Sequence, residues 1–136
     1  MKELTNAVIC VDDDPMILQV LAFQLNKILD AQNILIEFYT NPNDALADID
    51  VLITDKIDII FVLVDYQMPE MTGVELIRII KAKYPRLNCI MLSGQANAIQ
   101  VGDLESEDLL EQFIEKPWSE LDLRNAVLKL IRPTAI

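Results

Sequence analysis

The sequence predicts a single doubly wound α/β domain, in which five parallel strands form one sheet with helices on both faces. Two observations predict this fold. Five short apolar runs alternate with five stretches of helical periodicity, and a length of 136 residues suits one core. Hydrophobic residues make up 52% of the chain, which excludes a disordered protein. We expect the strand order 2-1-3-4-5, one of the common orders of doubly wound sheets.

In the first half of the chain, helix-capping signals separate predicted strands at residues 6–11, 33–39 and 58–64. Asp14 precedes a proline, which predicts an N-cap followed by the first helical position, and this helix runs to about residue 30. Asn41 repeats the pattern and begins a second helix that fades near residue 52. The third run lacks polar alternation, which is typical of a central strand buried on both faces.

In the second half, predicted strands at 88–92 and 112–115 alternate with three predicted helices. Thr72 can cap the first of these helices, and Pro85 ends it. A helical pattern that is less regular covers residues 96–110. Ser119, followed by Asp122 three residues later, resembles a capping box and begins the last helix.

Composition excludes several classes of function. The net charge of −11 argues against direct binding to nucleic acid or to an anionic membrane, since phosphate contacts need clustered Lys and Arg. The chain has no histidine, which excludes His-based triads and phosphorylation on its own histidine. No apolar run is long enough for a signal peptide or a membrane span, so we expect a cytoplasmic protein.

The two cysteines are expected to be free thiols. Cys10 and Cys89 lie in the first and fourth predicted strands, which the third strand separates in the expected order. Two strand spacings of ~4.8 Å exceed the roughly 7 Å between α-carbons that a disulfide tolerates. We therefore predict two buried thiols and no disulfide.

Polar residues stand where the predicted strands end. Asp12 and Asp13 follow the first strand, Asp65 follows the third, Ser93 the fourth, and Lys116 the fifth. Loops at the carboxyl ends of parallel strands converge on one crevice, so we expect these side chains to meet. Three close carboxylates repel one another unless a cation is bound, and Mg²⁺ or Mn²⁺ suits an oxygen-rich site of this kind.

This set of groups suits phosphoryl transfer. Asp65 is the candidate nucleophile, which would form an aspartyl-phosphate. Lys116 and the metal would neutralise charge on the transferred oxygens, and the Ser93 hydroxyl would donate a hydrogen bond to one of them. Gln67 and Gln95 lie two residues past the nucleophile and the hydroxyl, where an amide could orient or exclude an attacking water and so tune the phosphate lifetime.

The motifs VDDDP, LVDYQMPEMTGVEL, MLSGQA and FIEKPW together resemble the receiver domain of bacterial two-component response regulators. The resemblance covers roughly residues 5–131 and leaves 132–136 as a tail or the start of a linker. It implies a flavodoxin-like fold. It also implies that Asp65 is the phosphoacceptor, that Asp12 and Asp13 bind Mg²⁺, that Ser93 is the switch hydroxyl and that Lys116 contacts the phosphoryl group.

The resemblance has further implications for site residues and partners. The backbone carbonyl of Gln67 would complete the metal ligands, Phe113 would occupy the aromatic switch position without a hydroxyl, and the Lys116–Pro117 bond would be cis. The implied partners are a sensor histidine kinase or histidine phosphotransfer protein, and a downstream output protein or fused output domain. A phosphorylation-dependent dimer is a further option.

The leading hypothesis is a phosphorylation-dependent signalling switch. Asp65 would take a phosphoryl group from the partner, and the region from Ser93 to the last helix would shift. Such a protein takes part in its own phosphorylation and dephosphorylation and does not turn over external substrates. One alternative is a Mg²⁺-dependent phosphatase of the haloacid-dehalogenase type, although that class needs an Asp where this chain has Gln67. The other is an interaction module that works without phosphate.

Overall fold

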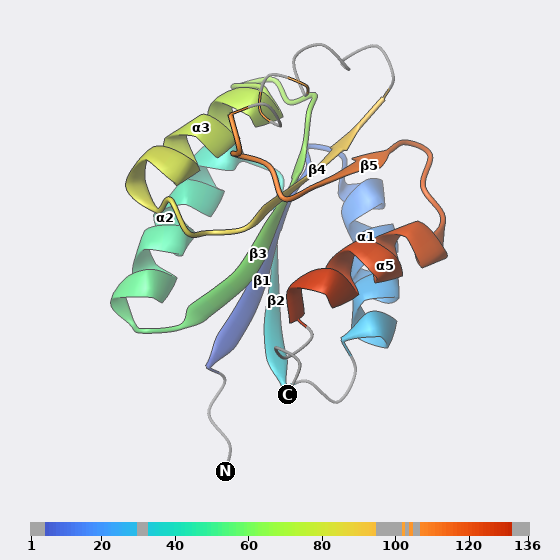
Figure 1. The fold of residues 1–136 in the computed structure, drawn as a ribbon, viewed down its shortest axis with the longest axis horizontal. Coiled ribbons are helices and arrows are strands. Elements are labelled where there is room, and N and C mark those ends of the chain that lie inside the picture. Colours follow the sequence, from blue (N-terminus) through green and yellow to red (C-terminus); the bar gives the residue numbers. More distant parts are fainter. Residues whose placement is uncertain (1–4, 30–32, 95–101, 103, 105–106, 132–136) are drawn as a thin grey trace.

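The computed structural model describes residues 5–29, 33–94, 102, 104 and 107–131 (Figure 1). Within them, five parallel strands form one sheet in the order β2-β1-β3-β4-β5, as predicted. The strands are β1 (Asn6–Val11), β2 (Ile34–Tyr39), β3 (Asp58–Asp65), β4 (Cys89–Ser93) and β5 (Gln112–Glu115). Each begins and ends within one residue of its predicted range.

Four of the five predicted helices lie in the described residues: α1 (Pro15–Ile28), α2 (Pro42–Thr54), α3 (Gly73–Lys83) and α5 (Glu120–Ile131). The fifth, predicted over 96–110, falls largely outside them, although Gly102 and Leu104 have helical backbone. Helices α2 and α3 cover one face of the sheet, and α1 and α5 cover the other (Figure 1). None of the described helices is both long and apolar enough to cross a membrane.

The predicted helix caps are present. The Asp14 side chain accepts a hydrogen bond from the backbone N–H of Met16 at 2.9 Å. Thr72 and Glu75 form a reciprocal capping box, with bonds of 2.9 and 3.2 Å. A cap of this kind contributes about 1 kcal/mol to stability. Each cap makes a helix begin a few residues after a strand, which holds the intervening loop at the carboxyl edge of the sheet.

The sheet separates two apolar layers. On β3, Val62 and Val64 pack with α2 and α3, whereas Phe61 and Leu63 pack with α1 and α5. A β-bulge at Ile60 interrupts the pairing of β3 with β1, and the uniformly apolar run gave no sign of it. Cys10 and Cys89 are buried and free, which confirms the prediction made for them.

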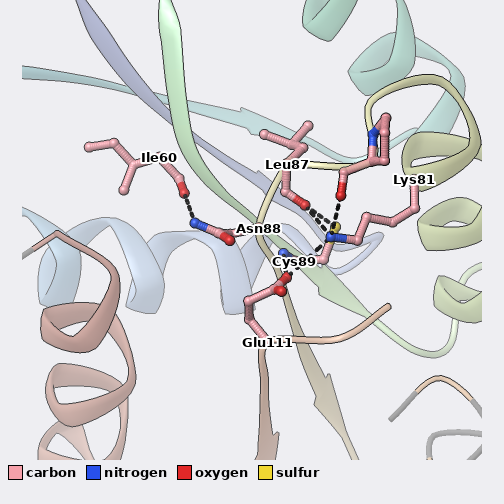
Figure 2. Close-up of polar contacts among 7 residues, drawn as sticks. Ile60, Lys81, Leu87, Asn88, Cys89 and Glu111 are labelled. Atoms are coloured by element: carbon pink, nitrogen blue, oxygen red, sulfur yellow. Dashed lines mark hydrogen bonds and ion pairs between the residues drawn. The ribbon is translucent and has the colours of Figure 1, made fainter. Parts of the chain in front are cut away.

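A buried lysine, Lys81 of α3, contacts the chain at the amino-terminal ends of β4 and β5 (Figure 2). The ammonium of Lys81 donates to the backbone carbonyls of Leu87 at 2.8 Å and Pro85 at 3.2 Å, and lies 3.4 Å from Glu111 Oε1. The same oxygen accepts a hydrogen bond from the backbone N–H of Cys89 at 3.0 Å. These contacts join the end of α3 to the starts of β4 and β5, at the edge of the sheet opposite Asp65.

Candidate functional site

The polar residues predicted at the strand ends meet at the carboxyl edge of the sheet. Carboxylate oxygens of Asp12, Asp13 and Asp65 lie within 4.8 Å of one another. The Lys116 ammonium donates to Asp65 Oδ1 at 2.5 Å and lies 3.7 Å from Asp12 Oδ2. Asp12, Asp65 and Ser93 are buried, and Asp13 is exposed. Among the described residues, the site therefore combines three carboxylates with the Lys116 ammonium.

Hydrogen bonds in the loop after β1 hold the Asp12 carboxylate beside those of Asp13 and Asp65. The backbone N–H of Asp12 donates to the carbonyl of Tyr39 at 3.0 Å, and its Oδ1 accepts from the backbone N–H of Asp14 at 2.9 Å. Its other oxygen, Oδ2, is buried without a hydrogen-bond donor among the described residues. A buried acceptor without a donor is costly. This oxygen and its two carboxylate neighbours fit a divalent cation with oxygen ligands.

The carboxyl groups of the site have perturbed pKa values. The pKa of Asp12 is raised from 3.8 to about 6, chiefly by burial. The charges of Asp65 and Asp13 contribute to this rise, while the hydrogen bond from the Asp14 N–H and the charge of Lys116 oppose it. Burial also raises the pKa of Asp65, with a contribution from Asp13, while the bonds from Lys116 and the Gln67 N–H oppose the shift. The ionised cluster is therefore unfavourable without additional positive charge.

Lys116 and Ser93 lie beside each other at the ends of β5 and β4. The backbone N–H of Lys116 donates to the carbonyl of Ser93 at 2.9 Å, which extends the ladder between the two strands. The Ser93 hydroxyl donates to the carbonyl of Gly94 at 3.1 Å. The Lys116–Pro117 peptide bond is cis, as predicted.

Three further residues are predicted to act at or near the site: Gln67, Phe113 and Gln95. Gln67 is exposed in the loop after β3, and its backbone N–H is directed at Asp65. Phe113 on β5 is half-buried and packs in the layer of α2 and α3, opposite Met91 of β4. Gln95 lies outside the described residues.

Sequence reasoning missed one contact beside the site. The indole N–H of Trp118 donates to Oε1 of Gln24 on α1 at 2.8 Å. The two residues are 94 positions apart, so neither a motif nor a local periodicity could have paired them. This contact links the loop after Lys116 to the helix that begins just after Asp13.

Comparison with known proteins identifies the family. A family model described as the response regulator receiver domain matches residues 8–128. No curated protein matches the chain. Among solved structures, the chain is similar to one described as an adenylate cyclase from Rhodopirellula baltica, with 26% identity over 94% of this chain and 88% of that chain and a TM-score of 0.76.

Two further structures share the fold. A response regulator receiver domain protein from Clostridium thermocellum is 22% identical over 93% of this chain and 94% of its own, with a TM-score of 0.76. A two-component response regulator from Cytophaga hutchinsonii is 20% identical over 94% and 98%, with a TM-score of 0.77. With the family match over most of its length, the chain belongs to the response regulator receiver domains, which are phospho-aspartate signalling domains rather than classical enzymes.

Proposed function

We propose that Asp65 is the phosphoacceptor and that it takes its phosphoryl group from a phosphohistidine on a partner protein. The observation that carries this proposal is the buried Asp65 carboxylate, which the Lys116 ammonium contacts and two further carboxylates flank. These 136 residues contain no histidine, so a phosphohistidine donor must lie outside them. A sensor histidine kinase or a histidine phosphotransfer protein meets this requirement.

The transfer is a displacement at phosphorus. A carboxylate oxygen of Asp65 forms the new P–O bond while the P–N bond of the donor breaks, and its electron pair returns to the donor imidazole. Lys116 then moves its hydrogen bond from the carboxylate to a phosphoryl oxygen, whose negative charge it neutralises. The Ser93 hydroxyl, at the end of the neighbouring strand, donates to a second phosphoryl oxygen.

Asp12, Asp13, Asp65 and the backbone carbonyl of Gln67 would hold Mg²⁺, for which Mn²⁺ can substitute. Mg²⁺ supplies positive charge at the transferring oxygens when it is bound. Asp12 Oδ2, which has no hydrogen-bond donor among the described residues, and the raised pKa values of Asp12 and Asp65 support this assignment, since a cation would both satisfy this oxygen and favour the ionised carboxylates.

Phosphorylation would act on the segment from Ser93 to α5. The phosphoryl group adds about −1.5 to −2 charges in a crevice whose Ser93 and Lys116 are joined through the backbone. Drawing both side chains toward the phosphate would displace β5 and Phe113, which lies on it. The altered face would then engage an output protein or a fused output domain, or a second phosphorylated copy of the domain.

Labelling with acetyl phosphate tests the proposal without the natural partner. With Mg²⁺ present, intact-mass measurement should show one added phosphoryl group, and peptide mapping should place it on Asp65. Asp65→Asn should abolish the label. Asp58→Asn is a matched control, because Asp58 lies exposed at the opposite end of the same strand. A label on any other residue would contradict the proposal.

Two further measurements separate the alternatives. Chelation of Mg²⁺ or the change Asp13→Asn should slow labelling strongly. A phosphatase of the haloacid-dehalogenase type would hydrolyse p-nitrophenyl phosphate with turnover, which we do not expect with Gln67 at the acid–base position. A folded wild-type protein that takes up no label would indicate an interaction module that works without phosphate.

A further inference from the structure

Lys116 lies just after a short edge strand that few contacts hold in place. It follows β5, a four-residue strand at the edge of the sheet, which among the described residues pairs with β4 alone. The last bond of that ladder joins the Lys116 N–H to the Ser93 carbonyl. Beyond this bond the chain leaves the sheet, yet the ammonium must be held within hydrogen-bond distance of Asp65. The direction of Lys116 therefore depends on what holds the loop that follows it.

Trp118 holds that loop against α1. Its indole N–H donates to Gln24 Oε1 at 2.8 Å, and its ring packs against the apolar layer between the sheet, α1 and α5. The indole is a donor only, so it needs an acceptor at this place. A second link, between Lys27 of α1 and Glu120 of α5, has side chains that are 53% and 36% exposed and so contributes less.

Helix α1 therefore contacts both the loop that carries Asp12 and the loop that follows Lys116. Its first turn is capped by Asp14, whose backbone N–H also fixes Asp12, and two turns later it presents Gln24 to Trp118. Four buried side chains fix this helix to the sheet: Leu18, Leu21, Leu25 and Ile28. The carboxylates after β1 and the loop after Lys116 are thus attached to the same rigid element.

We infer that Gln24 and Trp118 are positioning residues, which set the place of the Lys116 ammonium against Asp65 through their hydrogen bond. This inference rests on the proposed function and adds to it a contact outside the crevice. A net hydrogen-bond contribution near 1 kcal/mol corresponds to a change of about three- to tenfold in the labelling rate if it is lost only in the transition state. Small displacements of a catalytic group have effects of this size or larger.

Three variants isolate the hydrogen bond. Gln24→Met keeps the length of the side chain and removes the acceptor, whereas Gln24→Glu keeps an acceptor oxygen. Trp118→Phe keeps an aromatic ring and removes the N–H donor. Gln19→Met is the matched control, because Gln19 is exposed on the same helix. Thermal melting of each variant shows whether it is folded at the temperature of the assay.

The first measurement is the initial rate of Asp65 labelling by acetyl phosphate. Gln24→Met and Trp118→Phe should slow it about three- to tenfold, while Gln24→Glu and Gln19→Met stay within about twofold of the wild type. In a Lys116→Ala background, Gln24→Met should have no further effect. Wild-type rates in both acceptor-free and donor-free variants, or a further slowing in the Lys116→Ala background, would overturn the inference.

The second measurement needs no phosphorylation, so it separates this inference from the proposed function. The NMR chemical shift of the Lys116 ε-methylene group in the unphosphorylated protein reports the position of this side chain relative to the Asp65 carboxylate. It should change in Gln24→Met and Trp118→Phe and remain unchanged in Gln19→Met. An unchanged shift in both positioning variants refutes the positioning role. A wild-type protein that takes up no label refutes the proposed function, and the shift still decides the positioning role.

Discussion

Gly73 lies directly against the backbone of Asp65. A β-carbon at position 73 would lie 2.5 Å from the Asp65 carbonyl oxygen and 3.1 Å from the Met91 methyl carbon. The Gly73 N–H also donates to the carbonyl of Tyr66 at 2.8 Å, which draws the start of α3 onto the end of β3. The requirement is for space rather than for an unusual backbone angle, because Gly73 has no positive φ. Only glycine lets the helix begin this close to the proposed phosphoacceptor.

Gly73→Ala should therefore destabilise the domain and slow labelling of Asp65. The added methyl group forces the backbone of β3 and α3 apart, which we expect to lower the free energy of unfolding by about 1–3 kcal/mol. Urea denaturation measures the stability, and acetyl phosphate labelling measures the site. Gly102→Ala is the control, since Gly102 has helical backbone with no atom within 4 Å of an added β-carbon. Equal losses of stability and labelling in Gly73→Ala and Gly102→Ala would show that the close approach of Gly73 to Asp65 does not require glycine.

Asp12 should make the stability of the metal-free protein depend on pH. The pKa of its carboxyl is 3.8 in the unfolded chain and about 6 in the fold, so the folded state retains the proton between these pH values. This contribution is present at low pH and is lost as the pH rises through about 6, when burial of the charge costs about 1–3 kcal/mol.

Asp12→Asn should accordingly raise the free energy of unfolding at neutral pH and change it little at about pH 4. Urea denaturation in the presence of a chelator, with wild type and variant compared at both pH values, measures this difference. Asp55→Asn, at an exposed position after α2, should show no such difference. A gain in stability that is the same at both pH values would mean that the pKa of Asp12 is not raised.

Lys81→Met should destabilise the amino-terminal ends of β4 and β5, which lie opposite the site. The change removes the ammonium donor from the carbonyls of Leu87 and Pro85, of which the Leu87 carbonyl keeps the weak bond from the Cys89 thiol, and it removes the charge partner of Glu111. We expect the free energy of unfolding to fall by about 1.5–3 kcal/mol. Lys83→Met removes an exposed pair with Asp50 and should cost less than about 1 kcal/mol. Hydrogen exchange at the Cys89 amide should accelerate only in Lys81→Met, and equal protection in the two variants would contradict this reading.

Gln67→Leu should lengthen the life of the phosphorylated form. The exposed amide lies two residues past Asp65, where it can orient an attacking water, and leucine cannot. We expect decay to slow by about three- to tenfold, less than the effect of a group that itself transfers a proton. Phosphate release after rapid removal of the donor measures the decay. Mg²⁺ affinity should stay nearly constant, because the proposed ligand is the backbone carbonyl. Unchanged or faster loss of phosphate in Gln67→Leu would show that another residue controls the access of water to the phosphoryl group.

Local chemistry made most of the fold predictable from the sequence. Asp14 and Asn41 each precede a proline and cap a helix, and Thr72 forms its capping box with a residue three positions later. These signals operate within one helical turn. Placing Asp12 and Lys116 in one crevice needed only the rule that parallel strands present their carboxyl ends at the same edge.

What the sequence could not predict depends on contacts between distant segments. The bond between Gln24 and Trp118 and the half-buried contact between Lys81 and Glu111 join residues whose separation carries no pattern. The bulge at Ile60 lies in a run where every residue is apolar, so a one-residue slip leaves no trace in the hydrophobicity. The helix predicted over 96–110 falls mostly outside the described residues and stays a prediction.

The division of the core by the sheet has a consequence for protein engineering. Because α1 and α3 lie on opposite faces of the sheet, substitutions at Leu25 of α1 and at Ile80 of α3 act on side chains in separate apolar layers. Their energetic effects should be close to additive, as for sites without shared contacts. A combinatorial library that repacks α1 against α5 can therefore be selected while α2 and α3 keep their packing. Designers could vary the two halves in turn, and a folded parent would remain at every round.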